Sequence, residues 1–102
     1  MIHPAPAADG IEQFVLSVVP HVLDSGQGYD SQSCGDVAVE LAWYREDDYT
    51  WGMFLAVESK RRRVETPDNT SFRCTPGFDR AEYEQNLAAL LKDRYAEMLA
   101  QA

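Results

Sequence analysis

Apolar residues recur along this chain at two different periods, and each change of period marks a predicted element. The first pattern is helical and begins after Asp9, where Asp9 and Glu12 have the spacing of a capping box. The apolar positions that follow at helical spacing are Ile11, Phe14, Val15, Val18, Val19 and Val22. Pro20 interrupts them, because its ring removes the amide that would bond to the carbonyl of Leu16. We therefore expect a helix from Asp9 that ends near Val19 or kinks there.

The second pattern has a period of two and predicts a β-hairpin over residues 37–57. Its apolar positions are Val37, Val39, Leu41, Trp43, Tyr49, Trp51, Met53, Leu55 and Val57. All are odd-numbered, so they share one buried face only if paired residues have an even sum. A three-residue loop over 46–48 meets this condition, placing Arg45 opposite Tyr49 and Trp43 opposite Trp51, unless a bulge changes the pairing. If helices cover only this face, then Ala42, Tyr44, Phe54 and Ala56 are exposed on the other.

The remaining segments predict one short strand and a second helix. Residues 24–35 are rich in Gly and Ser and are expected to form a loop, while residues 59–75 should contribute one edge strand over 61–66, guarded by Lys and Arg. Asp79 and Glu82 repeat the capping-box spacing, with Phe78 and Tyr83 at staple positions. The buried stripe of this helix is expected to be Tyr83, Leu87, Leu90, Leu91 and Met98, with Tyr95 at its margin.

These elements predict one α+β domain over residues 9–102, in the order α-β-β-β-α, with the C-terminal helix packed on the sheet. Residues 1–8, with two prolines and three alanines, are expected to be a flexible N-terminal arm. No apolar run approaches the roughly 20 residues that span a bilayer, and the first residues lack the features of a signal peptide. We therefore expect a cytoplasmic protein that does not contact membranes.

Charge is distributed unevenly between the two halves of the chain. The whole chain has 17 acidic and 9 basic residues, for a formal net charge of −8. Residues 1–58 contain a single base, Arg45, whereas residues 59–102 are nearly balanced and include the run Lys60–Arg63. Such a charge balance argues against direct nucleic-acid binding and favours a partner with a basic surface. The basic run could bind an acidic surface, or it could be a solvated edge strand neutralised by nearby acids.

The sequence offers little support for catalysis or for a cofactor. His3, His21, Cys34 and Cys74 do not have the spacing of a metal site, and no phosphate-binding loop is present. A small cysteine-dependent enzyme would need Cys34 beside His21, yet Asp36 should raise the pKa of this thiol. Whether Cys34 and Cys74 form a disulfide is left open by the sequence, although a reducing compartment favours free thiols.

We therefore expect a binding protein without catalysis, metal or cofactor. The residues expected to contact the partner are Glu46, Asp47 and Asp48 at the hairpin tip, Asp30 and Asp36 in the preceding loop, and Tyr44 as an apolar anchor. The first hypothesis is an inhibitor that occludes a basic nucleic-acid-binding protein by mimicking DNA. In size and charge the chain is similar to inhibitors carried by phages and mobile elements, including anti-CRISPR proteins. The alternative is an acidic homodimeric secretion chaperone or adaptor, whose homodimer seam would be the exposed apolar face.

Overall fold

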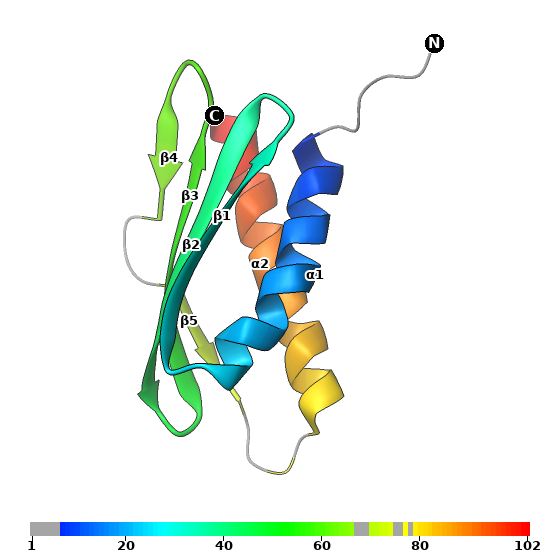
Figure 1. The fold of residues 1–102 in the computed structure, drawn as a ribbon, viewed down its shortest axis with the longest axis vertical. Coiled ribbons are helices and arrows are strands. Elements are labelled where there is room, and N and C mark those ends of the chain that lie inside the picture. The colour runs from blue at the N-terminus through cyan, green and yellow to red at the C-terminus, as the bar shows by residue number, and fades with distance from the viewer. Residues whose placement is uncertain (1–6, 67–69, 75–76, 78) are drawn as a thin grey trace.

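Seven helices and strands make up the part of the chain that the structure describes. The computed structural model describes residues 7–66, 70–74, 77 and 79–102 (Figure 1). The elements, in chain order, are α1 (Ala7–Asp24), β1 (Gln27–Cys34), β2 (Val37–Asp47), β3 (Thr50–Glu58), β4 (Arg63–Glu65), β5 (Thr70–Arg73) and α2 (Arg80–Gln101). The predicted α+β class is confirmed, with two more strands than the sequence pattern indicated.

The strands form one antiparallel sheet in the order β1-β2-β3, and two short strands share the far edge of β3. Near the end of β3, Glu58 is opposite Arg63 of β4, whereas near its start Trp51 is opposite Phe72 of β5. The sheet therefore has two different edges: β1 is a single continuous strand, and the other edge is divided between β4 and β5.

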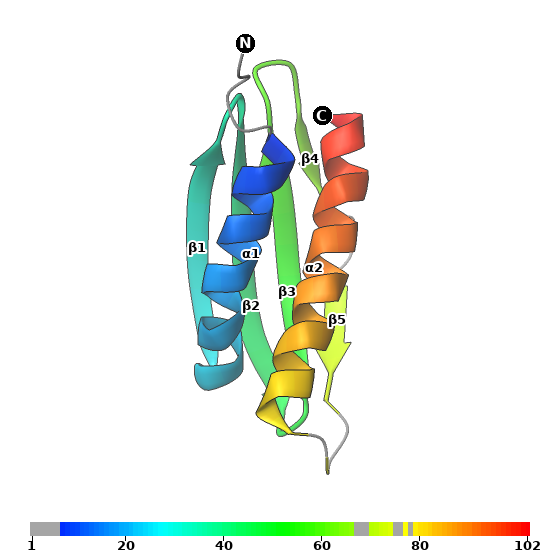
Figure 2. The same cartoon turned by 90° about the vertical axis from the view of Figure 1, so that its right-hand side faces the viewer.

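Both helices lie on the same face of the sheet (Figures 1 and 2). They run in opposite directions, so that α1 begins and α2 ends at the same end of the molecule. The largest fully buried side chains between the two layers are Tyr95, Phe14, Leu41, Met53, Leu55, Leu87, Leu91, Val15, Val18, Val22, Val39 and Val57. The odd-numbered apolar residues of the hairpin thus face the helices, as the period of two predicted, except Tyr49, which lies in the turn and is 43% exposed. The opposite sheet face, called here the open face, has no described element packed over it.

The register of the hairpin is shifted by two residues from the predicted one. Trp43 is opposite Met53, and Trp51 is opposite Arg45. The strands are joined by a two-residue turn, Asp48 and Tyr49, and an irregularity between Arg45 and Asp47 shifts the pairing by one residue. The bulge restores the even sum that a two-residue turn alone would break. The predicted loop over 46–48 and the Trp43–Trp51 pair were therefore wrong, although the buried face was right.

The segment predicted as a loop over residues 24–35 contains a full strand, and this prediction was wrong. β1 pairs with β2 along its whole length, from Gln27 opposite Tyr44 to Cys34 opposite Val37. Most of its residues are exposed or half-buried, because it is an edge strand with one face in solvent. No alternation of apolar residues was therefore available to predict it.

Residues 59–75 contain two short strands rather than one. The predicted edge strand over 61–66 is present as β4, with only three residues. The second strand, β5, has a single buried side chain, Phe72, too few for a recognisable period.

The first helix continues past its proline. α1 begins at Ala7, so Asp9 lies in the first turn rather than at the predicted cap position, and Pro20 lies inside the helix. The expected flexible arm over residues 1–8 lies outside the described residues for its first six positions. Pro20 is four residues before the end of α1, so it removes the backbone hydrogen bond to the carbonyl of Leu16 without ending the helix at Val19.

The second helix begins as predicted. The side chain of Asp79 accepts a hydrogen bond from the backbone N–H of Glu82 at 2.9 Å, which is the predicted N-cap contact. The staple partner Phe78 lies outside the described residues. Tyr95, predicted at the margin of the buried stripe, is fully buried and donates a hydrogen bond from its hydroxyl to the carbonyl of Glu40 at 2.7 Å. Burial raises the pKa of Tyr95, so this hydroxyl stays protonated and remains a donor.

Candidate protein-binding surface

The three predicted acidic residues Glu46, Asp47 and Asp48 lie together at one end of the molecule, at the tip of the β2–β3 hairpin. We call them the acidic tip. Asp47 has a structural role there, because its carboxylate accepts a hydrogen bond from the backbone N–H of Tyr49 at 2.8 Å. This bond, with others from Thr50, lowers the pKa of Asp47. Glu46 and Asp48 are exposed, and neither carboxylate bonds to the backbone of the turn in the contacts described.

Arg45 holds the backbone of the acidic tip. Its guanidinium donates hydrogen bonds to the carbonyl oxygen of Asp47 at 3.1 Å and to that of Asp48 at 2.9 Å. The guanidinium carbon Cζ of Arg45 lies 5.3 Å from the centre of the Trp51 ring. A cation over an indole face is a favourable contact. The single base of the first half of the chain therefore stabilises the turn and pairs with backbone carbonyls there, rather than with the acidic side chains.

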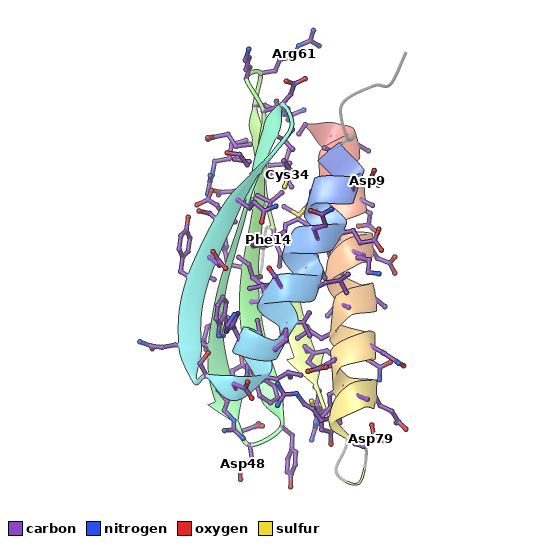
Figure 3. The ribbon with its side chains drawn as sticks, turned by 45° about the vertical axis from the view of Figure 1, so that its right-hand side comes forward. Asp9, Phe14, Cys34, Asp48, Arg61 and Asp79 are labelled. Atoms are coloured by element: carbon purple, nitrogen blue, oxygen red, sulfur yellow. The ribbon has the colours of Figure 1, made fainter. Side chains whose placement is uncertain are left out.

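The structure separates the remaining predicted acids from the acidic tip. Asp36 lies in the turn between β1 and β2, about 33 Å from Glu46 along the length of β2. Asp30 lies in the middle of β1, opposite Leu41, and its carboxylate accepts a hydrogen bond from the backbone N–H of Ser31 at 2.8 Å. Figure 3 shows the two ends of the molecule, with Asp48 at one and Arg61 at the other. The five acids expected to contact one partner are therefore not gathered in a single patch.

Two further acids of the first half of the chain, Asp24 and Glu40, are held in ion pairs. Arg80 contacts Asp24 at 2.8 Å and Glu84 at 3.1 Å, and it also donates to the carbonyl of Pro20. The hydrogen bond from Arg80 lowers the pKa of Asp24. This contact joins the end of α1 to the start of α2, so Asp24 serves the packing of the helices. Glu40, the second, lies on the open face.

Tyr44, expected to be an apolar anchor, lies on the open face beside the acidic tip. It is 40% exposed, and its hydroxyl donates to the carboxylate of Glu46 at 3.2 Å. Its ring covers Gly52 on the neighbouring strand, because a Cβ built at Gly52 would be 2.5 Å from the ring carbon Cζ of Tyr44. The absence of a side chain at Gly52 is therefore what allows this ring to lie flat on the sheet.

The open face also contains an ion-pair network that spans four strands. Arg63 of β4 forms an ion pair with Glu40 of β2, and it contacts Glu58 and Glu65 at 3.7 and 2.6 Å. Tyr29 of β1 donates its hydroxyl to the same Glu40 carboxylate. The bonds from Tyr29 and Arg63 lower the pKa of Glu40, and bonding to Glu65 and Glu40 raises the pKa of Arg63.

The network buries one apolar residue of the open face. Ala56 is opposite Glu40 on one side and Glu65 on the other, and it is fully buried. The Arg63–Glu40 pair crosses β3 at this position. Of the four residues expected to be exposed here, Ala56 is thus covered, Ala42 and Phe54 are half-buried, and Tyr44 is exposed. Tyr29, at 61% exposure, is a further aromatic residue of this face that the sequence pattern did not indicate.

The basic run Lys60–Arg63 is divided between two structural roles. Arg63 belongs to the network on the open face, while Arg62 donates to the carbonyl of Gln101 at the end of α2. Ser59 donates to the carbonyl of Ala102 at 3.1 Å and accepts from the N–H groups of Arg61 and Arg62. The turn thus places two donors, the Ser59 hydroxyl and the Arg62 guanidinium, at the negative end of the α2 dipole. Lys60 and Arg61 are exposed.

The two cysteines are free, buried and far apart. Cys34 lies against α1, because a Cβ built at Gly10 would be 3.0 Å from the Cβ of Cys34. Cys74 lies near the hairpin turn, where its backbone N–H donates to the carbonyl of Tyr49. They are separated by roughly 30 Å along the sheet, too far for a disulfide. His21 is eleven residues beyond Gly10 on α1, or about 16 Å, so the structure does not bring it to Cys34. Burial raises the pKa of both thiols.

Two hollows follow the outer groove between α1 and α2. One, of about 380 Å³, is lined by Leu16, Val19, Pro20 and the first half of α2, and the other, of about 360 Å³, by Ile11 and the second half. Lys92 borders both and forms an ion pair with Glu12 at 3.6 Å. Leu16 is 57% exposed there.

The described residues contain no cluster of three or more His, Cys, Asp or Glu that could hold a metal ion. Within the same residues, neither helix is long and apolar enough to cross a membrane. Comparison with protein-family models, with curated proteins and with solved structures found no match.

Proposed function

We propose that this protein is a non-enzymatic binding module that uses the open face and the acidic tip to hold a partner protein with a basic surface. The single observation that carries the proposal is the arrangement of the two layers. Both helices cover one face of the sheet, and the other face presents Tyr29, Tyr44 and Phe54 next to exposed carboxylates. Aromatic residues within a polar rim are typical of protein interfaces.

Charge supports a basic partner. Glu46 and Asp48 lie at the tip of a hairpin that forms one end of the molecule, where they are exposed to solvent. Carboxylates placed in this way attract a basic surface during encounter and increase the association rate. Tyr44 lies between the tip and the centre of the open face, so that a partner steered by the tip would reach the aromatic residues next.

A basic nucleic-acid-binding protein is the partner class that we propose first, because its working surface is complementary to phosphates. A small domain that offers carboxylates to such a surface would compete with nucleic acid. The separation of Asp36 from the acidic tip restricts this mimicry to one end of the molecule. The contact is therefore expected to be an end-on insertion of the hairpin, rather than an extended acidic strip.

The test compares two charge reversals of equal size. The double substitution of Glu46→Lys and Asp48→Lys changes the tip and leaves Asp47, which the turn requires, in place. The control, Asp93→Lys with Glu97→Lys, changes net charge equally on exposed positions of α2. Each purified protein is used to capture partners from a lysate of the native host at low and moderate salt. Captured proteins are identified by mass spectrometry and remeasured as purified pairs.

We expect the wild type and the α2 control to capture one basic protein. The tip variant should bind this protein at least tenfold more weakly than wild type at low salt. Nucleic acid should compete for the same partner. If the tip variant and the control bind equally, the acidic tip is not the contact. If the captured protein is insensitive to salt and to nucleic acid, the secretion chaperone or adaptor becomes the better function, with the groove between α1 and α2 as its docking surface.

A further inference from the structure

β1 is an open edge of the sheet. It has eight residues in one uninterrupted strand, and Figure 2 shows no described element beyond it. Edge strands in natural proteins are usually short, or protected by Lys, Pro or a bulge, because their free backbone groups can pair with another chain. β1 contains neither Lys nor Pro, and its pairing with β2 is regular throughout.

The free backbone groups of this edge can be assigned from the ladder. The N–H of Arg45 donates to the carbonyl of Gly26, so residue 26 directs its backbone groups towards β2. Direction alternates along an antiparallel strand, so the even-numbered residues of β1 bond to β2 and the odd-numbered ones point outwards. The outward groups belong to Gln27, Tyr29, Ser31 and Ser33. In this structure the N–H of Ser31 is held by the carboxylate of Asp30, which occupies one donor at the centre of the edge.

The other edge of the sheet is protected in the ways that β1 is not. β4 and β5 have three and four residues, and each includes an arginine, Arg63 and Arg73. Strand addition therefore favours the β1 side.

We propose that β1 pairs with β1 of a second copy of this chain, to give an antiparallel homodimer with one continuous sheet. The distribution of charge indicates that the strand pairing with β1 belongs to a second copy. The molecule is strongly acidic, so two copies can associate only through a surface with few charges, and β1 has Asp30 alone. The flank of α1 above this edge is defined by Gly10, which lies against Cys34. Ser17 and His21 follow on the same side of the helix and carry no carboxylate. A basic partner would find little complementary charge here.

The register follows from the position of Asp30. Pairing centred on Asp30 would place the two Asp30 side chains directly opposite each other, and like charges in that position are unfavourable. Pairing centred on Ser31 places Asp30 opposite Gln32 and Tyr29 opposite Ser33, and it uses the outward backbone groups of Tyr29, Ser31 and Ser33. Forming the bond across the seam replaces the exposed contact between Asp30 and the Ser31 N–H, which costs little because both groups are in water.

This dimer separates the acidic tips and extends the open face. Adjacent antiparallel strands are related by a two-fold axis perpendicular to the sheet, so the two tips lie at opposite ends and the two open faces on the same side. Each acidic tip then shares an end with the basic turn of the other copy. The homodimer is independent of the proposed partner, since it is measured on the purified chain alone.

The test measures the oligomeric state of the full chain by sedimentation equilibrium over a series of concentrations. Wild type is expected to dimerise reversibly. Ser31→Lys, which places two lysines at the two-fold axis, and Ser33→Pro, which removes an outward N–H without touching the β2 ladder, should each weaken dimerisation at least tenfold. The matched control is Ser71→Lys, which adds the same charge to β5 at the other edge and should leave the dimer unchanged.

A second experiment tests the register. With a short bismaleimide crosslinker, S31C should be joined to itself in high yield. S33C should not, because its two copies would be about 14 Å apart along the seam. Circular dichroism of each variant confirms that the fold is kept. A wild type that remains monomeric up to about 0.5 mM, or a dimer that Ser31→Lys and Ser33→Pro leave intact, overturns the proposal.

Discussion

Two neighbouring residues of β2 each cover a glycine on an adjacent strand, on opposite faces of the sheet. Tyr44 covers Gly52 on the open face, and Trp43 covers Gly28 of β1 on the helix face. A Cβ built at Gly28 would be 2.3 Å from Cζ2 and 2.7 Å from Cε2 of Trp43. Neither glycine has a positive φ, so the requirement for glycine is steric. Gly28→Ala and Gly52→Ala therefore add the same methyl group to two different environments.

The two substitutions should differ in cost because the two rings differ in freedom. Trp43 is 6% exposed and its indole N–H donates to Ser25, so its ring cannot move away without disturbing the core. Overpacking of this kind costs about 1–3 kcal/mol, against a gain of about 0.4–1 kcal/mol from restricting the unfolded chain. We expect Gly28→Ala to lower the free energy of unfolding by about 1–2 kcal/mol, and the Tm by roughly 5–10 °C. Tyr44 is exposed and can rotate outwards, so Gly52→Ala should stay within about 0.5 kcal/mol of wild type.

The assay is chemical denaturation of Gly28→Ala, Gly52→Ala and Trp43→Phe, and of the double variant Gly28→Ala with Trp43→Phe. Phenylalanine lacks the distal ring atoms of Trp43 that the new methyl group would meet. The double-mutant cycle should therefore show a favourable coupling of at least about 1 kcal/mol between the two sites. A Gly28→Ala variant as stable as wild type, or a coupling near zero, would refute the steric account. A cost at Gly52 equal to that at Gly28 would show that Tyr44 is fixed by the sheet.

Three further predictions concern single groups of the fold. Tyr95→Phe, which removes the buried hydroxyl bond to Glu40, should lower the free energy of unfolding by about 1 kcal/mol, as measured by urea denaturation. The depressed pKa of Glu40 means that its bonds stabilise the fold above the usual pKa of glutamate, about 4.3, and are lost as pH falls through the lower folded value. Glu40→Gln should therefore be less stable than wild type at pH 7, with the difference vanishing in acid; a constant difference across pH would contradict this. Cys34 and Cys74, whose pKa values burial raises, should react slowly with Ellman's reagent at pH 7.5 until the protein unfolds, and mild oxidation should form no bond between them.

The sequence predicted those elements in which one face is buried and the other exposed. The helices and the central hairpin have this contrast, so their periods could be read directly. β1 has little of it, since only Cys34 among its residues is buried. β5 buries Phe72 alone. Both strands are specified by their pairing with neighbours, information that lies outside their own residues.

The candidate site was predicted in part for a similar reason. The three residues of the acidic tip are consecutive in sequence, and they stay together in the fold. Asp30 and Asp36 were grouped with them on the assumption that residues 24–35 formed a loop beside the tip. Because residues 27–34 instead form a strand antiparallel to β2, Asp36 lies at the end of the molecule opposite the acidic tip. The hairpin register failed because the bulge beside Glu46 leaves no mark in a pattern of apolar positions.

The antiparallel arrangement of the two helices determines where a label, a surface or another domain can be joined without blocking the acidic tip. The start of α1 and the end of α2 both lie at the end of the molecule farthest from the acidic tip. A label, a surface or a fused domain that is joined at either of these two positions is therefore held at that end. The hairpin tip then points away from the attachment, at a distance of about 33 Å measured along β2. Immobilising the chain at the start of α1 or the end of α2 therefore leaves the acidic tip accessible, and an attachment within residues 46–49 would block it.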